Sequence, residues 1–283
     1  MFRNLAPGAI GIRTDLRGAL ALASEAGWQG IDVPISEAAA IAATTSAADV
    51  AALFTESGIR PGGWGLSIDW RVPYDRAALD TLAEHAALAQ QLGCTRVCTW
   101  LLPFSDERPF RENFAFHVQQ LQPIARTLEA HGCRLGLEFI GPRTMREEHR
   151  YGFIYSMEGM LCLADAIGSN VGLLLDCWHW YTSLGTIADL RALRAADIVY
   201  VHVNDAPAGI AIEAQADLVR CLPGTTGVID LTGFLRTIAE LGYDGPVTPE
   251  PFEKRLGDLP PAQASRETHA TMLAAWRAAG LGT

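Results

Sequence analysis

Short apolar runs alternate with longer helical stretches rich in alanine and leucine along the whole of this 283-residue chain. The apolar runs predict strands at 8–12, 29–33, 62–68, 94–101, 133–140, 171–176, 197–203 and 246–250. The helical periodicity predicts helices at 15–27, 46–57, 75–92, 112–131, 156–167, 186–195, 230–241 and 261–279. Eight repeats of a strand and then a helix indicate an α/β protein with a closed (β/α)8 barrel. No Ser/Gly linker divides the chain, so we expect one barrel domain over 1–283 with a C-terminal helix.

Glycine follows six of the predicted helices, in EAGWQG, ESGIRPGG, QLGCTRV, AHGCRLG, AIGSNVG and ELGYDGP. A glycine just past a helix end is the usual residue for turning the chain into the next element. This punctuation supports the same division into strands and helices.

Four of the predicted strands end on a residue able to bind a metal ion. They are LGLE at Glu138, GLLLD at Asp176, VYVH at His202 and PVTPE at Glu250. Each gap between them accommodates one strand and one helix, a unit that needs about 30 residues. Side chains at the same end of successive parallel barrel strands converge on one point. Three carboxylates and one imidazole around one point predict a metal site.

An oxygen-rich ligand set with one imidazole favours a single Mn²⁺ ion, with Mg²⁺, Co²⁺ or Zn²⁺ as alternatives. Such an ion binds the oxygens of a sugar and polarises its carbonyl, so that the adjacent C–H becomes acidic. Glu138 and Glu250 come from strands three apart in the ring and can face each other across the ion. One can take a proton while the other returns one. This arrangement fits isomerisation, epimerisation or loss of a β-hydroxyl.

The formal net charge is −10, and Lys254 is the one lysine among 22 basic residues. Because nucleic-acid binding needs a basic surface, we expect no nucleic-acid partner. No stretch approaches the roughly 18 to 20 apolar residues of a membrane span, and the N-terminus lacks the layout of a secretion signal. We therefore expect a cytoplasmic protein with no membrane partner. The alanine-rich, weakly charged helical surface predicts a homodimer or homotetramer.

Loops 141–155 and 204–229 exceed ordinary turns, and each follows a strand that carries a predicted ligand, so we expect them at the catalytic rim. The charged residues of the first loop are typical of a solvated face, and a phosphate clamp is the alternative. Since the second loop shows no glycine-rich phosphate cradle, we expect a neutral polyol as substrate. Trp100, with Trp64 and Trp70, is predicted to form an apolar wall against the sugar; core packing is an equal alternative for Trp64.

The segments LGLEFIG, LLLDCWHW, VYVHVNDAP, LPGTTGVID and GYDGPVTPEPF resemble the sugar phosphate isomerase/epimerase group of xylose-isomerase-like TIM barrels. That group includes ketose 3-epimerases, inosose isomerases and dehydratases, and hydroxypyruvate isomerases. The resemblance covers most of 9–253 and is strongest from 133 onward. It implies metal ligation by the four strand-end residues, with the two glutamates as the acid/base pair.

The resemblance also implies two substrate contacts. His179, in the DxxH segment, would touch substrate oxygens, and Arg220, just before LPG, resembles the arginine that holds a substrate hydroxyl or carbonyl in ketose epimerases. Packing among neighbouring aromatic residues is the alternative for His179, and pairing with Asp217 is the alternative for Arg220. Asp205 completes an HVND segment that resembles the inositol branch of the group, and it is also placed to orient the His202 imidazole.

Three functions follow from these patterns. The first is a metal-dependent isomerase or epimerase of a non-phosphorylated ketose or keto-polyol. The second is a lyase at the same site, an inosose dehydratase or an enzyme of β-elimination on 3-keto-glycosides, favoured by the HVND segment. The third is an endonuclease IV-like phosphodiesterase, which would need additional histidine ligands and a basic groove. The net charge and the scarcity of lysine argue against it.

Overall fold

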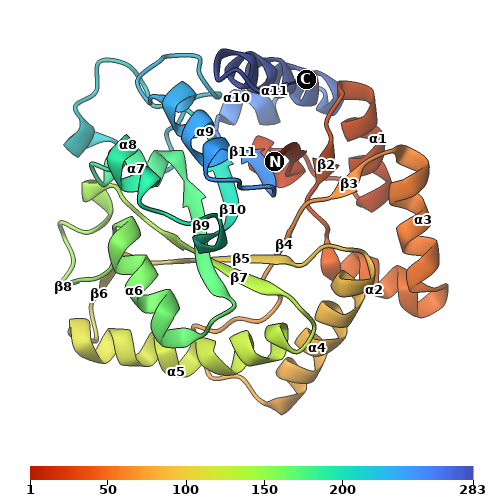
Figure 1. The fold of residues 1–283 in the computed structure, drawn as a ribbon, viewed down its shortest axis with the longest axis horizontal. Coiled ribbons are helices and arrows are strands. Elements are labelled where there is room, and N and C mark those ends of the chain that lie inside the picture. The colour runs from red at the N-terminus through yellow and green to blue at the C-terminus, as the bar shows by residue number, and fades with distance from the viewer. Residues whose placement is uncertain (283) are drawn as a thin grey trace.

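The computed structural model describes residues 1–282. Parallel strands form a ring at the centre of the molecule, and helices surround it (Figure 1). The main sheet has nine strands in the order β3-β2-β1-β11-β10-β9-β7-β5-β4, all paired in parallel. The strands are β1 (Phe2–Leu5), β2 (Gly30–Ile31), β3 (Arg60–Pro61), β4 (Trp64–Gly65), β5 (Arg96–Leu101), β7 (Arg134–Phe139), β9 (Val171–Asp176), β10 (Ile198–Val203) and β11 (Pro246–Pro249).

The two end strands of this sheet, β3 and β4, are halves of one barrel strand. Only Gly62 and Gly63 separate them. The N–H of Gly62 donates to the carbonyl of Ile31 at 2.8 Å, and the N–H of Leu66 donates to the carbonyl of Cys98 at 2.8 Å. These bonds join the third strand to its neighbours on both sides, so the sheet closes into a ring of eight strands, as the sequence predicts.

Close approach of polar side chains explains why glycine occupies the break between β3 and β4. A Cβ atom at Gly62 would lie 2.2 Å from Oδ1 of Asn4, and a Cβ at Gly63 would lie 2.6 Å from the ring of Tyr200. Both side chains belong to strands of the barrel and are buried inside it. The two glycines therefore make room for polar groups within the barrel.

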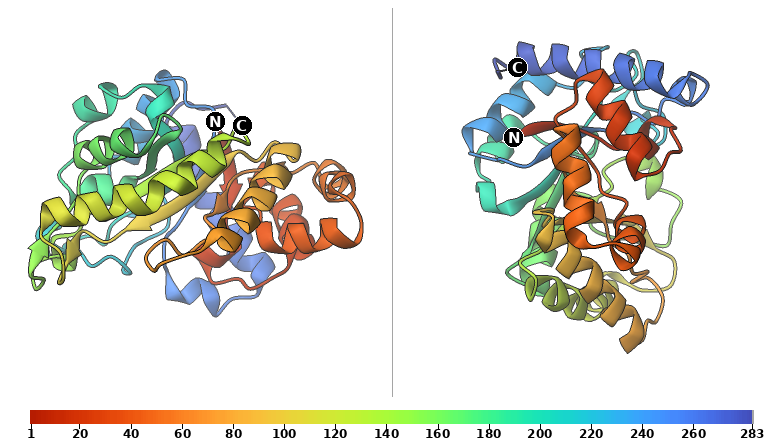
Figure 2. Two further views of the ribbon diagram at one scale, coloured as in Figure 1. Left: turned by 90° about the horizontal axis from the view of Figure 1, so that it is seen from below. Right: turned by 90° about the vertical axis from the view of Figure 1, so that its right-hand side faces the viewer.

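Helices cover the outside of the ring, and neighbours pack against one another until α11 meets α1 (Figures 1 and 2). The helices are α1 (Leu16–Ala26), α2 (Ile35–Thr44), α3 (Ala47–Ser57), α4 (Arg76–Gln91), α5 (Phe110–Glu129), α6 (Met157–Ile167), α7 (Cys177–Thr182), α8 (Ile187–Arg191), α9 (Leu231–Glu240), α10 (Lys254–Gly257) and α11 (Pro261–Ala278). Their apolar faces and the strands form one buried core. Within 1–282 no single helix is long and apolar enough to span a membrane. Helices α2 and α3 taken together have the length and apolar composition of a span, but the chain bends by 119° between them.

Most helix ends follow the local signals in the sequence. Side chains of Asp15, Ser46, Asp75 and Ser156 accept the N–H groups that a helix start leaves free. Five of the six predicted glycines turn the chain in the left-handed conformation: Gly27, Gly58, Gly93, Gly132 and Gly242. The sixth, Gly168, has an extended φ of 172°.

The first strand is the main correction to the predicted elements. The structure places it at Phe2–Leu5, whereas the predicted segment 8–12 overlaps the 3-10 turn Pro7–Ile10. The true strand carries Arg3 and Asn4, polar residues that are buried, so an apolar pattern could not reveal it. Helix α2 is a second difference, since the sequence pattern predicts a single helix, 46–57, in this region.

A short ribbon and a contact between the two long loops extend the barrel beyond the ends of its strands. A short antiparallel ribbon pairs β6 (Phe104–Ser105) with β8 (Tyr151–Gly152), which anchors loop 141–155 beside the segment after β5. This loop also reaches 204–229, because the hydroxyl of Thr144 donates to the carbonyl of Gln215 at 2.8 Å. The two long loops therefore contact each other at one rim of the barrel.

Candidate metal centre

The four predicted ligands meet at the carboxyl end of the barrel strands. Glu138 lies near the end of β7, Asp176 ends β9, His202 lies in β10 and Glu250 directly follows β11. One ligand atom from each lies within 4.8 Å of the others. The parallel register explains the convergence, because His202 is the direct partner of Asp176 across the β9–β10 pair.

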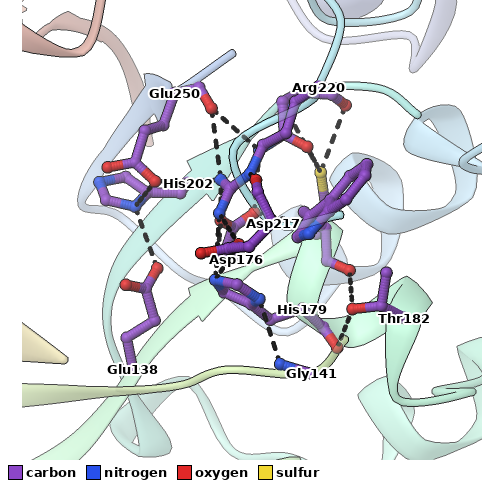
Figure 3. A network of polar contacts seen from close by, with 12 residues as sticks. Glu138, Gly141, Asp176, His179, Thr182, His202, Asp217, Arg220 and Glu250 are labelled. Carbon is purple, nitrogen blue, oxygen red and sulfur yellow. Dashed lines mark hydrogen bonds and ion pairs between the residues drawn. The ribbon is translucent and has the colours of Figure 1, made fainter. Parts of the chain in front are cut away.

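His202 lies between the two glutamates (Figure 3). Its Nδ1 atom is 3.2 Å from Oε1 of Glu138 and 3.5 Å from Oε2 of Glu250. Both glutamates and His202 line the same cavity. Both glutamates thus approach the same Nδ1 atom, one from β7 and one from the end of β11; that they face each other across an ion stays a prediction.

Asp176 is fully buried and its carboxylate is held from several directions. Its Oδ1 accepts the N–H of Trp178 at 2.8 Å and the amide of Asn204 at 3.1 Å. Its Oδ2 accepts a guanidinium N–H of Arg220 at 2.7 Å. These bonds fix the carboxylate in place.

Arg220 and His179 lie behind this site rather than in the wall of the cavity. The guanidinium bridges Asp176, Glu250 and Asp217, with its Nη1 atom 3.0 Å from Oε2 of Glu250 and its Nη2 atom 2.8 Å from Oδ1 of Asp217 (Figure 3). The pairing with Asp217 that the sequence left open is therefore present, together with contacts to two ligands. The roles of Arg220 and His179 as substrate contacts stay predictions.

The imidazole of His179 has two competing neighbours. Its Nδ1 lies 3.2 Å from the N–H of Gly141, and its Nε2 lies 3.2 Å from Nη2 of Arg220. A neutral imidazole has one lone pair for accepting a hydrogen bond, so only one of the two contacts can form at a time. Burial lowers the pKa of His179 to about 4, which keeps the ring neutral near pH 7.

Burial and charge change the pKa values of the ligands strongly. Burial raises the pKa of Glu138 to about 8. Burial alone would lower the pKa of His202, but the charges of Glu250 and Glu138 outweigh it and raise that pKa to about 10. Within residues 1–282 the three carboxylates of the site pair with His202 and Arg220 as cations, and hard oxygen donors with one imidazole suit a divalent cation. The residues present therefore fit a divalent metal ion.

A cavity of about 720 Å³ opens onto Glu138, His202 and Glu250. Trp64 and Trp100 line it. Trp64 is also part of the buried core, with its indole N–H donating to the carbonyl of Cys94 at 3.0 Å, so the core-packing alternative holds for it as well. Trp70 does not line the cavity: its indole N–H donates to the hydroxyl of Thr99 and its ring packs 5.1 Å from His117. The expectation for Trp70 is thus corrected, because its side chain turns into the core.

Asp205 has a different position from the one expected. Its carboxylate accepts the backbone N–H groups of Ala206, Thr226, Gly227 and Ile229 at 2.8 to 3.1 Å. These hydrogen bonds go to the loop after β10 and not to His202. The prediction that Asp205 orients the imidazole is corrected, since both of its oxygens hold the two ends of that loop together.

Several cavity residues were missed by the sequence analysis. Asp32 follows β2 in the segment QGIDV, in the same strand-end position as the predicted ligands. Tyr200 stands two residues before His202 and therefore shares its face of the strand. Phe252, two residues after Glu250, lines the cavity with a φ of 44°, which is uncommon for a residue other than glycine. Its ring lies 4.6 Å from the guanidinium carbon of Arg220.

The fold and the strand-end site place the chain in a known family. Residues 20–275 match the model of the xylose isomerase-like TIM barrel family, and the chain belongs to that family. Its fold resembles a xylose isomerase domain protein of Alicyclobacillus acidocaldarius with a TM-score of 0.87 and 31% identity, over 99% of each chain. It also resembles the structure of the IOLI protein with a bound zinc atom, with a TM-score of 0.77 and 20% identity, over 97% of this chain and 98% of that one.

The curated relatives are named for two types of reaction, isomerisation and dehydration. An inosose isomerase of Halalkalibacterium halodurans is 28% identical over 52% of this chain and 49% of its own length. A 3-dehydroshikimate dehydratase of Pseudomonas aeruginosa is 34% identical over 49% of this chain and 21% of its own length. The matches therefore span about half of the isomerase and about a fifth of the dehydratase. The chain is thus related to proteins named as an isomerase of an inosose and as a dehydratase of 3-dehydroshikimate.

Proposed function

We propose that this protein is a divalent-metal-dependent isomerase or epimerase of a non-phosphorylated ketose or keto-polyol. The observation that supports it most is the pair of glutamates that line one cavity and both approach Nδ1 of His202. Proton transfer beside a carbonyl requires a group to remove a proton and a group to return one. Glu138 and Glu250 supply both groups.

Glu138, Asp176, His202 and Glu250 would hold the ion. A bound divalent ion would polarise the substrate carbonyl and make the neighbouring C–H more acidic. Mn²⁺ is our first expectation because the donors are mainly oxygen, and the zinc atom of the IOLI protein keeps zinc as an alternative. Asp176, with all of its contacts inside the protein, would serve as a fixed ligand.

The surroundings of the two glutamates support their transfer of protons. Burial raises the pKa of Glu138 to about 8, and burial also raises the pKa of Glu250. A carboxyl whose pKa is raised is a stronger base than an ordinary glutamate and can release its proton again near neutral pH. The aromatic side chains of Trp64, Trp100 and Phe252 in the cavity wall would exclude water from the reacting carbon.

A screen of the Mn²⁺-loaded protein against ketoses and inososes tests this proposal. The expected product has the mass of the substrate and a different NMR spectrum, because isomerisation and epimerisation keep every atom. The chelated protein should give no product. Turnover that does not need a metal ion, or no turnover of any neutral ketose or inosose, would contradict the proposal.

A lyase that works through the same two glutamates is the second candidate. The similarity to 3-dehydroshikimate dehydratases supports it, and so does Arg13, an exposed cation in the lining of the cavity that could bind a substrate carboxylate. The mass of the product separates the two functions, since dehydration removes one water. A dehydrated product, together with a loss of activity in Arg13→Gln, would favour the lyase.

A further inference from the structure

Four polar side chains from different strands meet at the side of the cavity near β1 and β2. Asn4 comes from β1, Asp32 follows β2, Tyr200 comes from β10 and Thr248 from β11. Asn4, Tyr200 and Thr248 are buried, and Asp32 is half-buried. Tyr200 and Thr248 precede His202 and Glu250 by two residues, so these two side chains lie deeper in the barrel than the ligand that follows each of them, whereas Asp32 follows its strand as Glu250 does.

Two hydrogen bonds of this cluster reach one oxygen of Asp32, and others join the remaining three side chains. The amide of Asn4 donates to Oδ1 of Asp32 at 2.8 Å, and the hydroxyl of Tyr200 donates to the same oxygen at 2.5 Å. The amide of Asn4 also lies 2.9 Å from the hydroxyl of Thr248, which lies 2.5 Å from that of Tyr200. When Asp32 is ionised, the polar hydrogens of Asn4, Tyr200 and Thr248 all have a hydrogen-bond acceptor within the cluster.

The second oxygen of Asp32 has no such partner. Among residues 1–282, no group donates a hydrogen bond to Oδ2, although Asp32 lines the cavity together with Glu138, His202 and Glu250. Burial raises the pKa of Asp32 to about 6, so the carboxylate is mostly ionised above neutral pH and can only accept hydrogen bonds. A half-buried carboxylate with a free oxygen leaves hydrogen-bonding capacity for a ligand.

We infer that Oδ2 of Asp32 accepts a hydrogen bond from a substrate hydroxyl, and that this contact selects polyols with a hydroxyl remote from the reacting carbon. This inference rests on the proposed function, because it places the reacting carbon at Glu138 and Glu250. A phosphate or carboxylate would be repelled by Asp32 at this side of the cavity. The contact therefore specifies a neutral, hydroxyl-bearing end of the substrate.

The rigid cluster around Asp32 makes it a specificity-determining residue. Oδ1 is held by two donors, and the glycines at 62 and 63 allow those donors to approach. The free oxygen is thereby fixed in direction and cannot rotate to follow a misplaced hydroxyl. A hydrogen bond to a charged acceptor typically changes affinity by about 10- to 100-fold.

Calorimetric binding of an inosose, and of analogues that each lack one hydroxyl, to the Mn²⁺-loaded protein tests the inference. In the wild type we expect one analogue to bind about 10- to 100-fold more weakly than the inosose. Asp32→Asn retains the shape of the side chain. The affinity of this variant for the parent inosose should be lower than that of the wild type by a similar factor, and its affinity for that one analogue should fall little further. Asp165→Asn removes the same charge from an exposed position outside the cavity and is the matched control.

The possible results separate this inference from the proposed function. If Asp32→Asn is folded and binds every compound as the wild type does, the contact with Asp32 is wrong. If the wild type binds no inosose, the inference is overturned together with the class of substrate proposed above. Binding that shows the Asp32 effect, without any exchange of the substrate C–H with solvent, would support the contact and contradict the isomerase.

Discussion

Nη1 of Arg220 lies 2.7 Å from Oδ2 of Asp176, and both side chains are buried. The guanidinium balances charge that would otherwise stand unpaired behind the metal centre. It also lies 3.0 Å from Oε2 of Glu250, so one cation holds two predicted ligands. This arrangement links the stability of the metal-free protein to the same residues that would hold the ion.

Arg220→Gln should therefore destabilise the metal-free protein by about 3 to 5 kcal/mol, because it leaves a buried carboxylate without its partner. Added Mn²⁺ should recover part of that loss by supplying positive charge at the same place. Thermal unfolding with and without Mn²⁺ measures both effects. Arg266→Gln removes an exposed ion pair with Glu25 and should cost no more than about 1 kcal/mol. Equal effects of the two substitutions would contradict this account.

Gly62→Ala should destabilise the fold, because the added Cβ would lie 2.2 Å from Oδ1 of Asn4. Overpacking of this kind costs about 1 to 3 kcal/mol. Gly65→Ala is the matched control, since nothing lies within 4 Å of a Cβ there. Denaturant unfolding of both variants measures the difference. A Gly62→Ala protein as stable as Gly65→Ala would show that the Asn4 cluster is not close-packed.

Asp32→Asn should change how stability depends on pH. Burial raises the pKa of Asp32 to about 6, so the folded state binds this proton more readily than the unfolded state, whose aspartate has a pKa of about 3.9. The cost of the buried charge is present above pH 6 and disappears as the pH falls toward 4. His202 and Glu250 also face this carboxylate, and Tyr200 and Asn4 donate to it.

The stability that Asp32→Asn gains over the wild type should accordingly be largest near pH 8 and small near pH 4.5. Melting temperatures of both proteins across this range provide the measurement. Asp165→Asn, on the exposed face of α6, should show no such trend between pH 5 and 8. A difference between Asp32→Asn and wild type that is constant with pH would contradict the raised pKa.

Asp205→Ala should loosen the loop after β10. Four backbone N–H groups lose their acceptor, three of them at 226, 227 and 229. Buried donors left unpaired cost about 1 to 3 kcal/mol each, so we expect lower stability and faster proteolysis within 206–229. Limited proteolysis with mass spectrometry locates the cuts. Unchanged cleavage in this loop would show that Asp205 does not hold it.

The sequence predicts the repeat of strands and helices and the convergence of the four ligands, because apolar periodicity and barrel geometry determine both. It does not reveal β1, since Arg3 and Asn4 are polar and yet buried. It also misses Asp32, because one carboxylate after a short strand resembles any polar turn. Contacts across the barrel, such as those of Arg220, depend on loop conformation, which local sequence does not determine.

Exchange of the substrate C–H with deuterated solvent tests the central claim about Glu138 and Glu250 most directly. The Mn²⁺-loaded wild type should incorporate deuterium at the carbon next to the carbonyl of an inosose or ketose that it turns over. Glu138→Gln and Glu250→Gln should remain folded, because each replaces a carboxylate with a neutral group of the same shape, and should lose this exchange by a factor of about 10² or more. Exchange at the wild-type rate in both folded variants would contradict the claim that these two glutamates move the proton.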